Sequence, residues 1–153
     1  MKRFALGLSL LLSTAAADQV GVAASLGNAQ RIYGLEYQQD NGVRYGLGYG
    51  ELLLARSDAA LGADVAYLMP LSPLLQGYVQ PYYGFGLGAG LSLPAAGIRV
   101  GLYPNVLLGA NFANASPLTP FVEASAGPAL SFGSAFGVTL GYGLRLGVNY
   151  RLP

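Results

Sequence analysis

The chain has 153 residues, a formal net charge of +1, and charged side chains at 10% of its positions, compared with about a quarter in a typical soluble domain. This length fits one domain, and without a basic cluster a nucleic acid is not expected as a partner. The sequence has no Cys and no His, which excludes disulfides and thiolate metal sites and removes the commonest metal ligand and general base. Mean hydropathy is +0.44, yet no window reaches the roughly 18 continuous apolar residues of a transmembrane helix. The apolar residues are therefore spread by alternation, as in membrane β-barrels.

The first seventeen residues have the pattern of a secretory signal peptide. A positively charged start is followed by an apolar stretch, and Ala15 and Ala17 fit a signal-peptidase site. The alternative is a membrane anchor or a buried helix, but the apolar stretch is short for a span. We therefore expect a cleaved signal peptide at residues 1–17 and a single barrel domain at residues 18–153.

Apolar residues alternate with small or polar ones along the first half of the mature chain, which is the pattern of β-strands. We expect strands at residues 19–26, 31–38, 43–50 and 61–69. Asp40, Asn41 and Gly42 tolerate positive φ and predict a tight hairpin turn. The alternation fails at residues 51–54, which predicts a bulge or the rim of the strand there.

Four longer strands are expected in the second half of the chain, at residues 77–91, 98–112, 119–131 and 136–151. The last of them has the clearest alternation. Its bulky face holds Phe136, Val138, Leu140, Tyr142, Leu144, Leu146, Val148 and Tyr150. Its other face holds small, polar or charged residues. The run exceeds the roughly 9–11 residues that a tilted strand needs to cross a bilayer.

Pro104 interrupts the sixth expected strand. Proline cannot donate to a β-ladder, and a closed barrel has no edge strand on which to place it. Residues 103–105 could therefore form a turn, which would give nine strands, or a bulge within one long strand. Because the alternation keeps its parity across the proline, we favour one strand with a bulge, and eight strands in total.

These patterns predict an all-β fold, a single eight-stranded antiparallel up-and-down transmembrane β-barrel. The bulky faces would meet lipid, and the small polar faces would line a narrow lumen. A secreted lipocalin-like barrel that holds an apolar ligand predicts the reverse, with bulky side chains inside. Outward faces rich in Val, Leu and Tyr and almost free of charge would be poorly soluble, which favours the transmembrane barrel.

Six charged residues have inward parity, three acids and three arginines. They are Glu36, Arg44, Asp64, Arg99, Glu123 and Arg145. Eight strands leave a lumen just wide enough for side chains to fill it, and charges buried there must pair. The six residues could line a polar conduit or a binding site, but we interpret them as ion pairs that plug the lumen. We expect Arg145 to cross the lumen toward Glu123, Glu36 or Asp64, and we favour Glu123 because the two strands are consecutive.

The glycine-rich and tyrosine-rich segments also have structural interpretations. Residues 84–90 keep a period of two with no helix pattern after them, so they do not match a dinucleotide-binding loop. Inward-facing glycines would instead leave room for larger neighbours. Seven tyrosines have outward parity and fit aromatic belts at the membrane surfaces: Tyr33, Tyr37, Tyr45, Tyr49, Tyr83, Tyr142 and Tyr150. Tyr82 and Tyr103 have inward parity and are expected to fill the lumen.

Catalysis is not expected from this sequence. Ser125 and Glu123 share a face of one strand, but a serine beside a carboxylate without a base to accept its proton is not a nucleophile site. We expect no catalytic residue, no metal site and no cofactor.

Two segments resemble a known family. Residues 80–88 resemble the Pro-Tyr and alternating-Gly strand of the outer-membrane β-barrel domain family, the small OmpA/OmpX-like barrels, and residues 138–151 resemble its closing strand. The resemblance implies eight strands, periplasmic termini, location in a bacterial outer membrane, and assembly by the outer-membrane insertion machinery. Family members commonly end on an aromatic residue, whereas this chain continues past Tyr150 to Pro153.

The function expected from these observations is that of a non-enzymatic outer-membrane β-barrel with a structural or interaction role in the cell envelope. We expect a monomer whose partner is outer-membrane lipid. A narrow channel for small solutes is the alternative function. The family also contains adhesion proteins, but that task depends on long external loops, and the loops expected here are short.

Overall fold

A computed structural model describes residues 18–28, 30–52, 58–71, 78–93, 97–113, 117–133 and 135–153. Within these residues the chain forms eight strands. They are β1 (Gln19–Gly27), β2 (Gln30–Gln38), β3 (Val43–Leu52), β4 (Asp58–Pro70), β5 (Val79–Ser92), β6 (Arg99–Phe112), β7 (Leu118–Phe132) and β8 (Gly137–Arg151). Residues 1–17, where the signal peptide is expected, lie outside the described residues.

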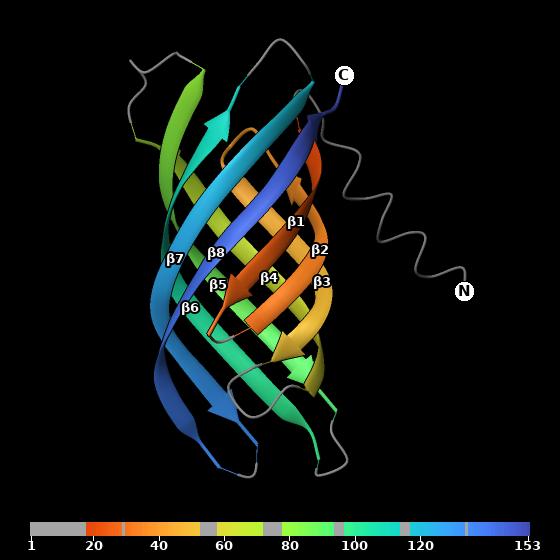
Figure 1. Ribbon diagram of the computed structural model, residues 1–153, viewed down its shortest axis with the longest axis vertical. Coiled ribbons are helices and arrows are strands. Elements are labelled where there is room, and N and C mark those ends of the chain that lie inside the picture. The colour runs from red at the N-terminus through yellow and green to blue at the C-terminus, as the bar shows by residue number, and fades with distance from the viewer. Residues whose placement is uncertain are drawn as a thin grey trace, which may run out of the picture.

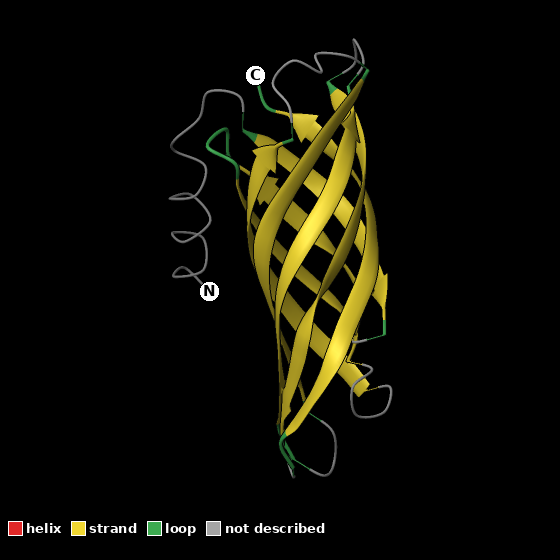
Figure 2. Ribbon diagram, turned by 90° about the vertical axis from the view of Figure 1, so that its left-hand side faces the viewer, coloured by secondary structure: helices red, strands yellow, loops and turns green. Residues whose placement is uncertain are grey.

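The strands close into one barrel. Each strand pairs antiparallel with the next in the chain, and β8 returns to pair with β1, where Gln19 lies opposite Arg151. Figures 1 and 2 show a tall, narrow barrel of tilted strands, with the C-terminus at the same end as the start of β1. The strands lengthen around the barrel, from 9 residues in β1 and β2 to 15 in β7 and β8. The predicted fold class, strand number and strand order are confirmed.

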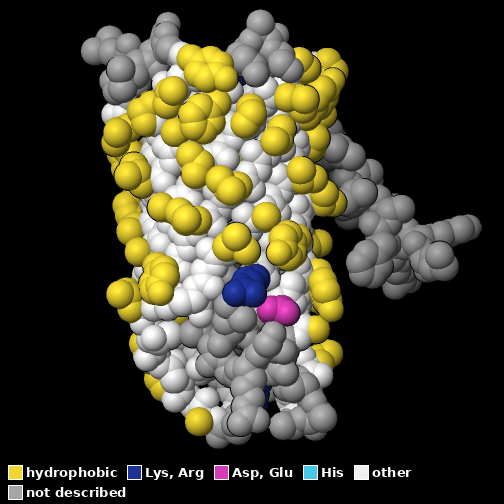
Figure 3. All heavy atoms as spheres, in the orientation of Figure 1, with side chains coloured by type: hydrophobic (Ala, Val, Ile, Leu, Met, Phe, Trp, Pro, Cys, Tyr) yellow, Lys and Arg dark blue, Asp and Glu magenta, His cyan; other side chains and the backbone are white. Residues whose placement is uncertain are grey.

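The bulky faces of the strands point outward, as predicted. Leu35, Leu47 and Leu140 are 68%, 68% and 69% exposed, and Figure 3 shows apolar side chains spread over the outer wall. Six of the seven tyrosines with outward parity are exposed; the seventh, Tyr37, donates a hydrogen bond to the carboxylate of Asp18. A lipocalin-like arrangement, with bulky side chains inside, is therefore wrong for this chain.

Aromatic side chains fill the lumen by lying over glycines of other strands. Tyr82 and Tyr103 are 5% and 8% exposed, as their inward parity predicted. A Cβ atom added at Gly109 would lie within 3.0 Å of the Tyr82 ring, and one at Gly141 within 3.0 Å of the Tyr103 ring. Real Cβ atoms do not approach neighbours so closely, so the small inward residues give the rings their space.

The turn between β2 and β3 forms at the residues that predicted it. The Gly42 amide donates to the Gln39 carbonyl (3.0 Å), and Gly42 has a φ of 87°, which is costly for residues with a Cβ. The Asn41 side chain accepts a hydrogen bond from the Val43 amide (3.0 Å). These contacts match a three-residue hairpin loop in which a left-handed glycine follows the turn.

Of the two explanations expected for the failed alternation at residues 51–54, the structure shows the rim of the strand, because β3 ends at Leu52, and the described residues show no bulge there. β3 keeps one register through Glu51 and Leu52 with both neighbouring strands. Residues 53 and 54 lie outside the described residues. The change of pattern arises because Glu51 has outward parity, which places a charge on the face that otherwise meets lipid.

Pro104 lies inside β6, as favoured, but the expected bulge is wrong. Leu102 pairs with Leu130 and Val106 with Ala126, so the register with β7 is the same on both sides of the proline. No extra residue has been inserted. Among the described residues the β6–β7 ladder instead lacks the three pairs between those two, while the ladder between β5 and β6 is continuous.

The gap has a simple cause, because the register places Pro128 directly opposite Pro104. The Arg151 amide donates to the Pro117 carbonyl (3.0 Å), so odd-numbered residues of β7 bond to β8 and even-numbered ones face β6. Pro104 and Pro128 therefore face one another at a position where each strand would donate one hydrogen bond. Neither has an N–H, and two ladder bonds are lost together.

Replacing both prolines should restore these bonds. We expect Pro104→Val/Pro128→Val to unfold at a higher temperature than the parent in detergent, with a gain of about 1 kcal/mol for each bond formed. Loss of proline rigidity in the unfolded chain opposes part of this gain. Pro120→Val is the matched control, since residue 120 precedes the first β6–β7 pair, Asn111 with Phe121.

Circular dichroism would give the unfolding temperature, and amide hydrogen exchange would show whether the two new N–H groups are protected. Fast exchange at both positions, with stability no higher than that of the Pro120→Val control, would contradict this account of the gap.

Candidate functional site

The first group of lumen charges is centred on Arg44, on β3. Its guanidinium donates two hydrogen bonds to the carboxylate of Glu123 on β7, at 2.8 and 2.9 Å, and Tyr82 donates a third to Glu123 at 3.1 Å. Arg44 and Glu123 are 2% and 4% exposed. We call these three residues the Arg44 cluster. It joins two strands that are not neighbours, so the fork of hydrogen bonds spans the lumen.

The second group is centred on Arg145, on β8. One terminal nitrogen donates to Glu36 on β2 at 2.6 Å, and the other donates to Asp64 on β4 at 3.0 Å. Side-chain exposure is 13% for Arg145, 1% for Glu36 and 28% for Asp64. We call these residues the Arg145 cluster. One arginine thus holds two acids from two other walls of the barrel.

The favoured pair of Arg145 with Glu123 is wrong, whereas the other two candidate partners, Glu36 and Asp64, are the acids that Arg145 contacts. The two residues lie opposite one another in the β7–β8 register, yet their side chains choose other partners. Both oxygens of Glu123 already accept hydrogen bonds from Arg44. Arg145 has glycines at positions 143 and 147 beside it, so nothing on its own face prevents it from reaching across the lumen.

Arg99 lies outside both clusters. It is the first residue of β6 and pairs with Ser92, at the end of the barrel away from the termini. Its inward parity was read correctly from the alternation, but parity gives no height along the barrel. Five of the six residues with inward charge are therefore brought together, and the sixth is placed near the rim.

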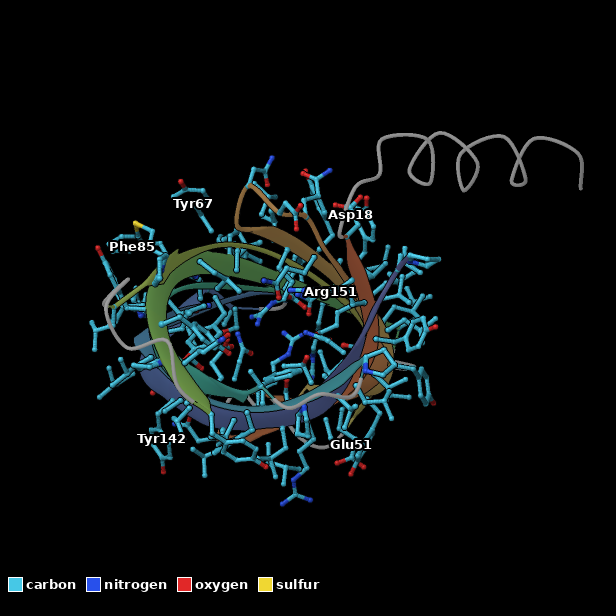
Figure 4. All side chains as sticks on the ribbon, turned by 90° about the horizontal axis from the view of Figure 1, so that it is seen from above. Asp18, Glu51, Tyr67, Phe85, Tyr142 and Arg151 are labelled. Carbon is cyan, nitrogen blue, oxygen red and sulfur yellow. The ribbon has the colours of Figure 1, made fainter. Side chains whose placement is uncertain are left out.

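The lumen between the clusters contains little free space. One cavity of about 50 Å³ is lined by Arg44, Asp64, Glu123, Arg145 and their neighbours, and a second of about 20 Å³ lies beside Ile32 and Arg145. A drug-sized ligand needs roughly 300–1,000 Å³. These cavities have room for a few water molecules and not for an organic ligand. Figure 4 shows side chains crowding the inside of the ring of strands.

The described residues offer no arrangement typical of catalysis or metal binding. They contain no group of three or more His, Cys, Asp or Glu residues placed to hold a metal ion. Ser125 accepts a hydrogen bond from Tyr103 at 3.3 Å, while Glu123, two residues away, is engaged by Arg44 and Tyr82. In this arrangement neither Glu123 nor Tyr103 is placed as a free base for the serine hydroxyl.

Two lumen residues have roles that the sequence analysis did not assign. Tyr82 was expected to fill space, but it also completes the hydrogen bonding of Glu123. Ile32 has inward parity on β2 and lies over Gly48 and Gly62, where added Cβ atoms would meet its side chain. Its parity could have indicated an inward position; the glycines opposite it are on two other strands and could not be assigned before the register was known.

Removing the charge of Arg145 should destabilise the barrel strongly. Arg145→Ala leaves Glu36 and Asp64 without their partner, and breaking a buried pair in this way costs about 3–5 kcal/mol. Adding Glu36→Gln should recover part of the loss. In double-mutant cycles on the detergent-folded barrel, Arg145 should couple to Glu36 more strongly than to Glu123, and Arg44 should couple strongly to Glu123.

The matched comparison is Arg151→Ala, which removes an arginine of the same strand and parity from the exposed end of β8. It should change stability little. Equal coupling of Arg145 to Glu36 and to Glu123 would contradict the partner assignment.

The fold of this chain has counterparts among solved structures, although its sequence has no match among family models or curated proteins. No protein-family model matches the sequence, and no curated protein matches it. Among solved structures, the N-terminal β-barrel domain of Pseudomonas aeruginosa OprF is similar, with 17% identity and a TM-score of 0.54 over 89% of this chain and 97% of that one.

Two other solved structures overlap at lower scores. A de novo designed transmembrane β-barrel has 17% identity and a TM-score of 0.48 over 92% of this chain and 98% of that one. Neisserial surface protein A has 19% identity and a TM-score of 0.44 over 89% of this chain and 96% of that one.

The described residues include no helix that is long and apolar enough to cross a membrane. The likeness to the OprF domain, together with the closed eight-stranded sheet and its apolar outer wall, confirms the fold of a small transmembrane β-barrel of the outer-membrane type.

Proposed function

We propose that this protein spans the outer membrane as a non-enzymatic barrel with a structural or interaction role, and that its lumen is closed by charged pairs. The observation that carries the proposal is the pair of clusters that cross the lumen. The Arg44 cluster links β3 to β7, and the Arg145 cluster links β8 to β2 and β4. Together they tie walls of the barrel to one another across the lumen.

The outer wall supports a position in a membrane. Its exposed side chains are Leu, Val, Tyr and Phe from all eight strands. In water this surface would be an aggregation liability, because soluble monomers rarely expose contiguous apolar patches above a few hundred Å². In a bilayer the same surface is solvated by lipid chains, and a closed sheet leaves no unpaired edge.

The width of the lumen supports closure. Two arginines, three acids and Tyr82 occupy its middle, and the cavities beside them measure about 50 and 20 Å³. Each of these charges is held by at least one opposite charge. Moving one of them out of the lumen would leave its partner buried and unpaired, at a high cost in free energy. A narrow channel for small solutes is the competing function, and it requires these clusters to open.

The remaining parts of the proposal follow from the same chemistry. Glu123, on the same face as Ser125, is held by Arg44 and Tyr82 and is not free to accept the serine proton, which supports a role without catalysis. The partners proposed are outer-membrane lipid and, during assembly, the outer-membrane insertion machinery, with the barrel acting as a monomer. The short connections at the end away from the termini, such as the one from Phe132 to Gly137, favour a structural role over adhesion.

Two measurements test this function. Fractionation of cells that express the full chain should place the mature protein in the outer membrane; recovery in the soluble periplasm would contradict the membrane position. Purified barrel in a planar lipid bilayer should show no large steady conductance. Reproducible large openings of the parent protein would favour the channel instead.

Two double variants separate the volume of the Arg44 cluster from its charge as the cause of closure. We expect Arg44→Ala/Glu123→Ala, which empties the middle of the lumen, to raise the bilayer conductance above that of the parent. Arg44→Met/Glu123→Leu keeps similar volume without charge and should stay closed, since apolar residues often replace buried pairs without loss of stability. Similar conductance in both variants would contradict closure by this cluster.

A further inference from the structure

The outer face of β2 and β3 changes character along its height. Four cross-strand pairs follow one another on this face, and their order runs from charged to aromatic to aliphatic and back to aromatic. The pairs are Arg31 with Glu51, Tyr33 with Tyr49, Leu35 with Leu47, and Tyr37 with Tyr45. Beyond the last pair the chain turns through Asp40, Asn41 and Gly42. Such an order is expected where a wall passes from headgroups into hydrocarbon and out again.

The apolar part of this wall is unusually short. Tyr33 and Tyr37 are four residues apart, which is about 13 Å along a strand and about 10 Å of height at the usual barrel tilt. The apolar band of an outer-membrane barrel is about 25 Å tall. On β8, by contrast, the outward apolar residues run from Val138 to Tyr150, twelve residues apart, which is about 30 Å of height by the same conversion.

Two charges limit the short wall at the end away from the termini. Among strand residues whose side chains the structure describes, Arg31 and Glu51 are the charged ones with outward parity. Figure 4 shows Glu51 outside the ring of strands, and Figure 3 shows one basic and one acidic side chain side by side on an otherwise apolar wall. A charge facing hydrocarbon is costly, so this pair must lie at headgroup level.

A shift of the whole barrel cannot place both ends of this wall correctly. Arg31 and Asp40 are nine residues apart, which is about 23 Å of height by the same conversion, so these two can reach the surfaces of a bilayer of ordinary thickness. The tyrosine pairs between them would then lie inside the hydrocarbon and away from the headgroups that they prefer. Tilting the barrel does not help either, because the two tyrosine pairs that bound this wall remain equally close together. The mismatch can be relieved by a bilayer that is thinner beside β2 and β3.

The charged end of the wall is also hollowed. A groove of about 450 Å³ is lined by Arg31, Tyr33, Tyr49, Gly50, Glu51 and Ala59. A guanidinium matches the geometry of a phosphate group, and tyrosine hydroxyls act as donors at headgroup level. The size and the donors of this groove fit one lipid headgroup.

We propose that this groove binds the phosphate of an anionic lipid through Arg31, and that the bound headgroup lies deeper than its neighbours, so that the bilayer is thinned beside β2 and β3. Tyr33 and Tyr49 line the same groove, and their hydroxyls donate to the headgroup. Glu51 opposes the phosphate, because it lies opposite Arg31 in the register and carries the same charge as the ligand. This inference rests on the membrane position proposed above.

The depth of the wall can be measured with tryptophan, because the chain contains none. Single variants Tyr33→Trp, Tyr45→Trp and Leu146→Trp would be folded into phosphatidylcholine vesicles brominated either near the headgroup or near the chain end. We expect Tyr33→Trp and Tyr45→Trp to be quenched more by the shallow bromine, and Leu146→Trp more by the deep one. Deep quenching at either tyrosine position would overturn the thinning.

The headgroup site is tested with a Leu47→Trp reporter, which keeps both tyrosines. Brominated phosphatidylglycerol, diluted into plain phosphatidylcholine, should bind about fivefold more tightly than brominated phosphatidylcholine, as one arginine at the surface predicts. Arg31→Gln should abolish this preference, and Glu51→Gln should increase it. Arg151→Gln, which removes an arginine at the other end of the barrel, should leave it unchanged.

The outcomes separate this inference from the proposed function. If Leu146→Trp is not quenched by either bromine position, the barrel is not in the bilayer, and the proposed function fails. If Leu146→Trp is quenched but Arg31→Gln keeps the full preference for phosphatidylglycerol, the membrane barrel stands and the headgroup site is overturned.

Discussion

Lipid offers no hydrogen-bond partners to a backbone, so every strand of this barrel depends on its two neighbours, and the sheet must close. Closure with eight strands fixes a narrow lumen, and the narrow lumen decides which residues can point inward. Bulky rings such as Tyr82 and Tyr103 fit because other strands present glycine where the rings lie, and charges fit because they meet opposite charges across the barrel. The alternation of bulky outward residues with small or polar inward ones along the sequence is a direct consequence of this constraint.

The gap between β6 and β7 shows how such a barrel tolerates proline. A single proline in a closed sheet would leave the opposite strand with an unused acceptor and remove one donor. Here Pro104 and Pro128 share one pair, so both losses fall at the same place and the flanking register is undisturbed. The continuous β5–β6 ladder then carries that part of the wall. The alternation predicted the unbroken strand because parity depends on the register, and the register never changed.

The sequence predicted features that depend on a single strand, and it did not predict features that depend on several strands at once. The face on which a residue lies depends on its own strand, so the inward positions of Glu36, Arg44 and Asp64 and the outward tyrosines were predictable. The partner of a lumen charge depends on height and on strands across the barrel, which requires all eight registers at once. For that reason Arg145 was assigned to Glu123 on the adjacent strand, whereas its long side chain reaches Glu36 and Asp64.

Charges inside and outside the barrel both need stabilising surroundings, but they find them in different places. Inside, Arg44 and Arg145 are surrounded by protein, so their cost is met by acids that the strands themselves bring into reach. Outside, Arg31 faces the bilayer, and the surroundings can move: a lipid headgroup is mobile where a strand is not. A barrel whose strands range from 9 to 15 residues therefore does not meet a flat band of hydrocarbon. Its tall wall at β8 and its short wall at β2 and β3 require different local thicknesses, and the outward charges lie on the short one, where the headgroups are nearest.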